Sequence, residues 1–285
     1  MMNMTTPTGG RAILCLSSKT PDPDSIRFAE QITRAFKMKL ILLHTSRDTA
    51  ELHRGQLAIE SARQLLQTEP DELLEIRGNL EAALQEELDP VAHELVILGT
   101  SLESFDRSTT MMSRRLAQRP GDSVLIIQHP AQAIRRILIC TGGQPASNLV
   151  IERGLTLGRE LGAEATILHV VSGIPTMYTG LPAVEEGLQQ ILSRDTPLAQ
   201  HLRAAARLAE ETGVKAQLAL RHGVVVEEIL RACEMVPYDL VVIGSPEPRS
   251  ILDHIVLGRI GPQLLSSMRI PLLIARLDPE AAAGS

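Results

Sequence analysis

Short apolar runs alternate with helical segments along the chain, and this alternation limits the possible folds more than any other feature. In the first half, largely apolar runs occupy residues 12–16, 40–43, 73–77, 95–99 and 124–127. Between them, helices are expected at about 24–36, 50–67 and 80–88, the first of them capped by Asp24. Nearly continuous apolar strands between helices are typical of a parallel sheet covered on both faces, so the pattern predicts a doubly wound α/β fold.

The same order of segments occurs twice. Cys15 and Cys140 lie 125 positions apart, each inside a matching apolar run, whereas Gly78 and Gly223 lie 145 positions apart. The second half has therefore gained 20 residues (145 − 125) between its second and third strands. These extra residues fall within 172–200, which is rich in Gly and Pro, and we interpret this segment as a surface insertion with a short helix.

The repeat also predicts the domain organisation. We expect a first domain at residues 1–130 and a second at residues 131–285, joined near residues 129–135. Ligands of such sheets bind at the carboxyl ends of the strands, at the point where the strand order reverses.

Charge and composition exclude several classes of partner. A net charge of −6 disfavours nucleic acids and anionic membranes, and an aromatic content of 2% leaves little for stacking on bases. No apolar run is long enough to span a bilayer, and the N-terminal residues lack the apolar region of a signal peptide, so we expect a cytoplasmic location. Three cysteines without paired spacing predict buried thiols rather than disulfides or a metal site.

The stretch 239–275 combines a strand, a glycine loop, a helix and another strand. The apolar run 240–243 ends at Gly244 and Ser245, and Gly258 follows 14 positions after Gly244. Apolar residues then recur at helical spacing from Ile260 to Met268. Backbone N–H groups in a glycine turn and at a helix start can face an anion, so this stretch predicts a phosphate site.

This stretch resembles the universal stress protein family, whose fourth strand ends in G-x-x-G, nine residues, and G followed by Ser or Thr. Gly244 and Gly258 match the outer glycines, while the middle glycine falls at Glu247 or Pro248 and Arg259 replaces the hydroxyl residue. The resemblance covers nearly the whole chain, once per half. It implies two tandem doubly wound sheets of five parallel strands, paired within the chain as a pseudo-dimer, and an adenine nucleotide such as ATP as ligand.

The loop after Cys140 carries the second part of the resemblance. The first strand of nucleotide-binding members usually ends in Asp-Gly-Ser, and the Asp contacts the adenine or ribose end of ATP. Thr141 stands at the Asp position, Gly142 keeps the glycine and Gly143 replaces the Ser. Without the carboxylate, a tight turn with no ligand explains this loop about as well as a site does. The loop also resembles, more briefly, the S-G-G-x-D-S loop of ATP pyrophosphatases.

The resemblance and the glycine loops together define a candidate nucleotide site in the second half. Val170 follows a strand at a position where the family often packs adenine against the backbone, and two arginines can supply charge to phosphates. The candidate residues are Thr141, Gly142, Gly143, Val170, Gly244, Ser245, Arg249, Gly258, Arg259 and Gly261. The first half lacks a second glycine between Gly99 and Gly121, so we expect no phosphate cradle there.

These observations predict a regulatory module of the stress response, with no catalytic residues and no bound metal. His44 and His169 match by repeat, but two histidines at separate strand ends do not make a metal site. An adenine nucleotide is the expected partner, and a homodimer is compatible with the fold. The alternatives are a nucleotide-free interaction protein on the same fold, or an adenylating enzyme, for which the required carboxylate cluster is absent from the loop after Cys140.

Overall fold

The apolar runs of the sequence form the strands of a mostly parallel α/β structure, as predicted. The computed structural model describes residues 10–88, 94–99, 123–144, 147–172, 187–244 and 260–275. By its internal contacts the chain divides into two units. One contains residues 1–134 with 269–276, and the other contains residues 135–268 with 277–285.

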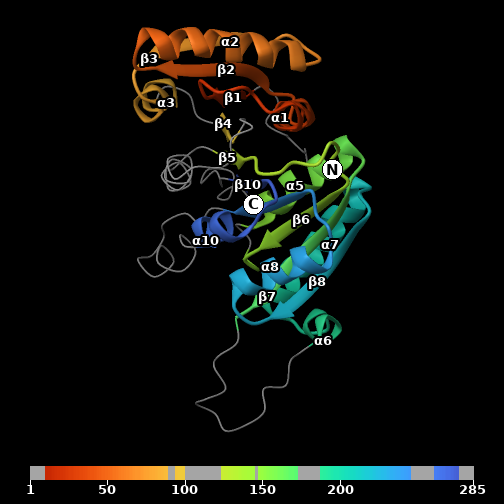
Figure 1. Cartoon of the computed structure of the whole chain (residues 1–285). Coiled ribbons are helices and arrows are strands. Elements are labelled where there is room, and N and C mark those ends of the chain that lie inside the picture. The colour runs from red at the N-terminus through yellow and green to blue at the C-terminus, as the bar shows by residue number, and fades with distance from the viewer. Residues whose placement is uncertain are drawn as a thin grey trace. The chain divides into compact units, whose positions relative to one another are not determined.

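The strands of the first unit follow the order β3-β2-β1-β4-β5-β10. All are parallel except β10, which runs antiparallel to β5 with Leu273 opposite Leu125. Helices α1 and α2 pack on β2, and Figure 1 shows α2 running along β2. The elements of this unit are β1 (Arg11–Leu16), α1 (Pro23–Ala35), β2 (Lys39–Ser46), α2 (Thr49–Leu65), β3 (Glu72–Arg77), α3 (Leu80–Leu88), β4 (Glu94–Leu98), β5 (Ser123–Ile126) and β10 (Leu272–Ala275).

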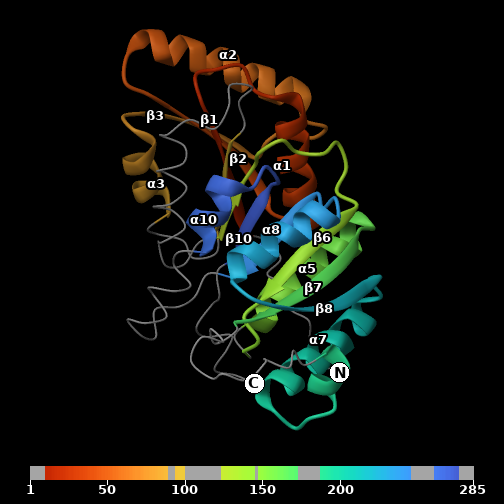
Figure 2. The same ribbon diagram turned by 60° about the horizontal axis from the view of Figure 1, so that its bottom comes forward.

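The strands of the second unit follow the order β9-β6-β7-β8, all parallel. Helices α5 and α7 pack together on one face, and α8 packs with α10 on the other; the helices can be followed in Figures 1 and 2. The elements are β6 (Arg136–Thr141), α5 (Asn148–Leu161), β7 (Glu164–Val171), α6 (Leu188–Leu192), α7 (Pro197–Thr212), β8 (Ala216–His222), α8 (Val225–Met235), β9 (Leu240–Gly244) and α10 (Ile260–Ser267).

Side-chain caps determine where several helices begin. The prediction that Asp24 caps α1 is wrong: Asp22 is the cap, and its carboxylate accepts a hydrogen bond from the Ser25 amide at 3.1 Å. Pro23 occupies the first helical position, where its missing N–H costs nothing, so Asp24 falls in the first turn. Thr196 caps α7 in the same way, accepting from the Ala199 amide at 3.2 Å.

Part of the predicted surface insertion belongs to the core of the second unit. Ile191 of α6 is only 6% exposed and packs with Ala199 and Leu202 of α7. Leu218 and Leu220 of β8 pack against the same cluster. The sequence interpretation missed this contact because five residues of helix carry too short a pattern to show a buried face. Residues 173–186 of the insertion lie outside the described residues.

All three cysteines are free thiols, but only Cys15 is buried as expected, whereas Cys140 and Cys233 are half-buried. Cys15 and Cys140 lie in β1 and β6, and burial raises the pKa of Cys15 to about 12. Across the ranges given above, no helix is long and apolar enough to cross a membrane.

Candidate functional site

The carboxyl edge of the second sheet brings together the strand ends that the sequence singled out. In the pairing of β6 with β9, Cys140 lies opposite Ile243, so Thr141 and Gly244 are next to each other. In the pairing of β6 with β7, Thr141 lies opposite His169. Five of the predicted site residues, Thr141, Gly142, Gly143, Val170 and Gly244, therefore lie at one edge of one sheet.

The Thr141 side chain is already engaged within the chain. Its hydroxyl is 2.7 Å from Nε2 of His201 on α7, and it accepts a hydrogen bond from the Gly143 amide at 3.2 Å. The Gly142 amide donates to the Ser147 hydroxyl at 3.3 Å. The turn that could cradle an anion with its N–H groups thus has both of these amides bonded to side-chain oxygens.

His169 packs under the same turn. Its Nδ1 lies 3.0 Å from the Thr141 carbonyl oxygen, and because a carbonyl only accepts, Nδ1 carries the proton. Burial lowers the pKa of His169, His222 lowers it further, and the bond to Thr141 acts in the opposite direction. Gly143 has φ +78, and a Cβ at this position would lie 2.6 Å from the His169 ring, so only glycine fits the turn.

His201 is the most perturbed of these groups. It is 4% exposed, and its Nδ1 has no hydrogen-bond partner among the described residues. Burial, assisted by the neighbouring His169 imidazole, lowers the pKa of His201 to about 4. At neutral pH the imidazoles of His169 and His201 are therefore uncharged. Together with the Thr141 hydroxyl they can exchange hydrogen bonds, but they do not supply charge to a phosphate.

Val170 does not point to the same side as Thr141. Neighbouring strand residues alternate between faces, so Val170 lies on the face opposite to His169. Its partner on β8, Arg221, bonds Glu228 of α8 at 3.3 Å, which places Val170 on the α8 face. Thr141 and Val170 thus share an edge of the sheet but not a face, and one ligand could touch both only at the end of the strands.

The remaining predicted site residues divide into two groups. Gly261 lies in the first turn of α10 and is buried. Ser245, Arg249, Gly258 and Arg259 lie outside the described residues. Gly244 itself is packed against α5, since a Cβ there would lie 2.8 Å from a Val150 methyl group.

The matching edge of the first unit is filled by backbone and side-chain atoms of the unit itself. Gly99 has φ +90, and a Cβ there would lie 2.2 Å from the Ile127 carbonyl oxygen. His44 is 1% exposed, with its Nε2 3.0 Å from the Ser18 hydroxyl. Its ring packs against α2 at Gly55, where a Cβ would lie 2.0 Å from His44 Cε1. These glycines make room for protein atoms, which accounts for them without a ligand.

Sequence reasoning identified His169 but missed its neighbours His201 and His222. A signal was present for His201, because Leu198, Leu202 and Ala205 form one stripe of α7 and position 201 falls on it. A histidine on the apolar stripe of a helix is a buried imidazole that needs a polar partner. In the part of the chain that the structure describes, no group of three or more His, Cys, Asp or Glu residues could hold a metal ion.

The sequence of this chain is similar to that of known proteins. The sequence model of the Universal stress protein family matches residues 133–276. Universal stress protein MJ0531 of Methanocaldococcus jannaschii is 28% identical over 153 residues, which are 53% of this chain and 87% of that protein.

Several solved structures match nearly the whole chain, among them the following two. A universal stress protein of Archaeoglobus fulgidus aligns with a TM-score of 0.64 at 10% identity, covering 94% of this chain and 97% of that one. A functionally unknown protein, PA1789, of Pseudomonas aeruginosa aligns with a TM-score of 0.63 at 14% identity, covering 96% and 98%. At these identities the two structures support the fold alone.

Proposed function

Because this chain belongs to the universal stress protein family, we propose that it is a stress-response regulatory module whose second unit binds an adenine nucleotide. The nucleotide, ATP or a close relative, would lie at the carboxyl edge of the sheet. There it would contact Thr141, Gly142 and the loop that leaves Gly244. The cytoplasmic location and the association of two copies expected from the sequence belong to the same proposal.

The adjacency of Thr141 and Gly244 is the observation that supports this proposal best. In parallel sheets, ligands bind where loops leave neighbouring strands at their carboxyl ends, and β6 and β9 are such neighbours. The loop that follows Gly244 contains Arg249 and Arg259, whose guanidinium groups can pair with phosphate oxygens. The Thr141 hydroxyl would replace a carboxylate in contacting the sugar or the base.

Titration calorimetry with ATP, ADP and AMP tests the proposal, together with mass spectrometry of nucleotides released from the purified protein. Gly258→Val should weaken binding by at least about 10-fold, because a branched side chain would fill the space that phosphates need. Gly187→Val is the matched control, since a Cβ at Gly187 meets nothing within 4 Å. Gly99→Val is unsuitable as a control, because Gly99 packs against the Ile127 carbonyl and the variant would disturb the first unit.

A nucleotide-free interaction protein is the second candidate, and one observation favours it. The Gly142 and Gly143 amides and the Thr141 hydroxyl already have hydrogen-bond partners within the chain. A nucleotide would have to displace some of these bonds, which lowers the net gain from binding. If the wild-type protein releases no nucleotide and gives no heat with any of the three at about 1 mM, the nucleotide proposal fails and this reading replaces it.

A further inference from the structure

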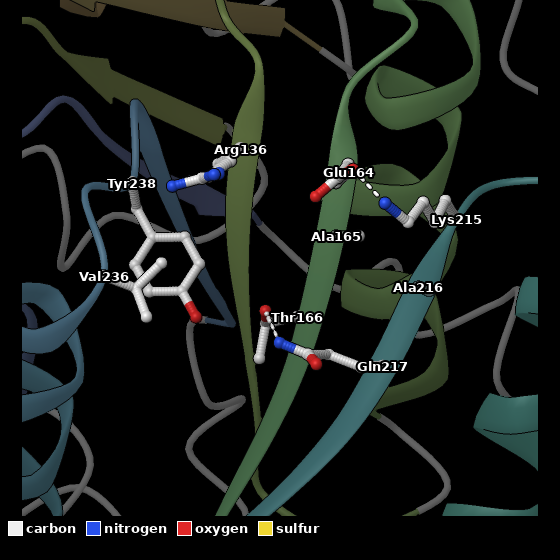
Figure 3. A pocket seen from close by; sticks show the side chains of 9 residues that line it. All are labelled: Arg136, Glu164, Ala165, Thr166, Lys215, Ala216, Gln217, Val236 and Tyr238. Carbon is white, nitrogen blue, oxygen red and sulfur yellow. Dashed lines mark hydrogen bonds and ion pairs between the residues drawn. The ribbon is translucent and has the colours of Figure 1, made fainter.

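A pocket of about 390 Å³ lies at the amino ends of β6, β7 and β8, at the end of the strands opposite to the predicted nucleotide site (Figure 3). It exists because α8 is short. Eleven helical residues cover about 16 Å, whereas the eight residues of β7 span about 26 Å. The helix starts beside the carboxyl ends of the strands and ends at Met235, so the amino end of this face remains open.

One wall of the pocket is apolar and held in place. It consists of Val236 and Tyr238, from the turn after α8, and Tyr238 is only 8% exposed. The Asp239 carboxylate accepts hydrogen bonds from the amides of Arg135 and Arg136 at 2.8 and 2.9 Å, and the Asp239 amide donates to the Arg136 carbonyl at 2.9 Å. These bonds fasten the turn to the start of β6, so the wall is formed before any ligand arrives.

The rim of the pocket carries two cations and one anion. Arg136 and Glu164 are opposite each other on neighbouring strands, yet Glu164 Oε1 bonds the Lys215 ammonium instead. That hydrogen bond and charge lower the pKa of Glu164, so its carboxylate is ionised at neutral pH. In Figure 3 the Arg136 side chain extends toward Tyr238 and away from Glu164. Among the described residues, the Arg136 guanidinium and Glu164 Oε2 have no side-chain partner.

The floor offers further polar groups at a defined position. The Gln217 amide nitrogen donates to the Thr166 hydroxyl at 3.1 Å, and this bond orients the Gln217 carbonyl oxygen as a free acceptor. The pocket therefore presents an open donor set at Arg136, open acceptors at Glu164 and Gln217, and an apolar wall between them and α8.

We propose that this pocket binds a free α-amino acid with an apolar side chain. The ligand carboxylate pairs with Arg136, its ammonium group donates to Glu164 and Gln217, and its side chain packs on Tyr238 and Val236. Opposite charges on neighbouring strands complement a zwitterion, whereas the net charge of +1 on the lining is too small for a polyphosphate. A volume near the lower end of the 300–1,000 Å³ typical of ligand pockets also fits a ligand smaller than a nucleotide.

L-Leucine, 4-methylpentanoate and 3-methylbutylamine separate the contributions of the two charges, since the second lacks the ammonium group and the third lacks the carboxylate. When the full chain is titrated with leucine, calorimetry and saturation-transfer NMR should both show saturable binding. Each analogue should bind at least about 10-fold more weakly, because it loses one charged hydrogen-bonding group. The Glu164 side chain is half exposed, so the contacts are screened and we expect a Kd of roughly 0.1–1 mM.

Two variants assign the charges to residues. Arg136→Gln and Glu164→Gln should each weaken leucine binding by at least about 10-fold. Glu164→Gln should not weaken binding of 4-methylpentanoate, and Arg136→Gln should not weaken binding of 3-methylbutylamine, because each analogue lacks the group with which the removed charge would pair. Arg207→Gln, at an exposed position of α7 away from the pocket, is the control and should bind leucine like the wild type. Thermal unfolding of each variant confirms that it is folded.

Two results would overturn the proposal. One is equal affinity for leucine and 4-methylpentanoate, unaffected by Glu164→Gln, which would make the pocket a simple anion site. The other is the absence of saturation by leucine at about 20 mM in the folded wild-type protein. Neither result depends on whether a nucleotide binds at the opposite end of the strands, so this inference and the proposed function fail independently.

Discussion

Acid should destabilise the second unit through His201, in a way that the structure allows to be calculated. The pKa of His201 falls from 6.5 to about 4 on folding, because its imidazole is buried beside His169. Above about pH 7.5 the residue is neutral in both states and contributes nothing to the pH dependence. As the pH falls below 6.5, the unfolded chain binds a proton that the folded chain does not, so stability decreases until about pH 4.

The size of the effect follows from the two pKa values. With 6.5 for the unfolded chain and about 4 for the folded chain, linkage gives a loss of about 1.4 kcal/mol at pH 5.5. The loss grows to about 2.6 kcal/mol at pH 4.5 and approaches about 3.4 kcal/mol at lower pH. These values are large beside the 5–15 kcal/mol that stabilises a typical domain.

Urea denaturation at pH 7.5, 5.5 and 4.5 measures the effect, with the wild type compared to His201→Gln. Glutamine can still exchange a hydrogen bond with the Thr141 hydroxyl but does not titrate, so its stability should fall less steeply with pH. Both tyrosines, Tyr178 and Tyr238, belong to residues 135–268, so tyrosine fluorescence follows the second unit. His53→Gln, at an exposed position of α2, is the control for loss of a histidine and should behave like the wild type. Parallel stability curves for the wild type and His201→Gln would show that the folded protein protonates His201 freely, and the burial argument would be refuted.

Two further substitutions test the packing of the first unit. Gly55→Ala should destabilise it by about 1–3 kcal/mol, because the new Cβ would lie 2.0 Å from His44 Cε1, and a second change, His44→Ala, should restore much of the loss. Glu30→Ala should lower the free energy of unfolding by about 3 kcal/mol. The Glu30 carboxylate is only 3% exposed, and it accepts hydrogen bonds from the backbone amides of Gln67 and Thr68 and from the Thr68 hydroxyl. Urea denaturation followed by circular dichroism measures both, and losses below about 0.5 kcal/mol would contradict the reasoning.

The candidate site could be predicted only in outline. Because strand ends in a doubly wound sheet follow from topology, the sequence located the turn at Thr141–Gly143 and the end of β9 at Gly244. It could not show that His201 would reach the Thr141 hydroxyl, since the two residues are 60 positions apart and the insertion lies between them. Nor could it show that Val170 lies on the α8 face, because that depends on the pairing of β7 with β8.

Local patterns determined the elements themselves. A period of two or a continuous apolar run makes a strand, a period of 3.6 makes a helix, and these periods are properties of neighbouring residues. The α/β class, the parallel direction of every described strand except β10, and the helix from Ile260 to Ser267 were therefore readable from the sequence alone.

Contacts between distant segments were decided only by the tertiary structure. The pairing of β10 with β5 joins residues almost 150 positions apart, and the open end of the α8 face depends on the difference in length between a helix and the strands that it covers. The burial of His201, the unpaired guanidinium group of Arg136 and the free Oε2 atom of Glu164 likewise depend on which neighbours the fold supplies. The sequence specifies which residues are present and their local periodicity, but the pKa and the free hydrogen-bonding groups of a side chain depend on solvent exclusion and on partners, which exist only after the chain has packed.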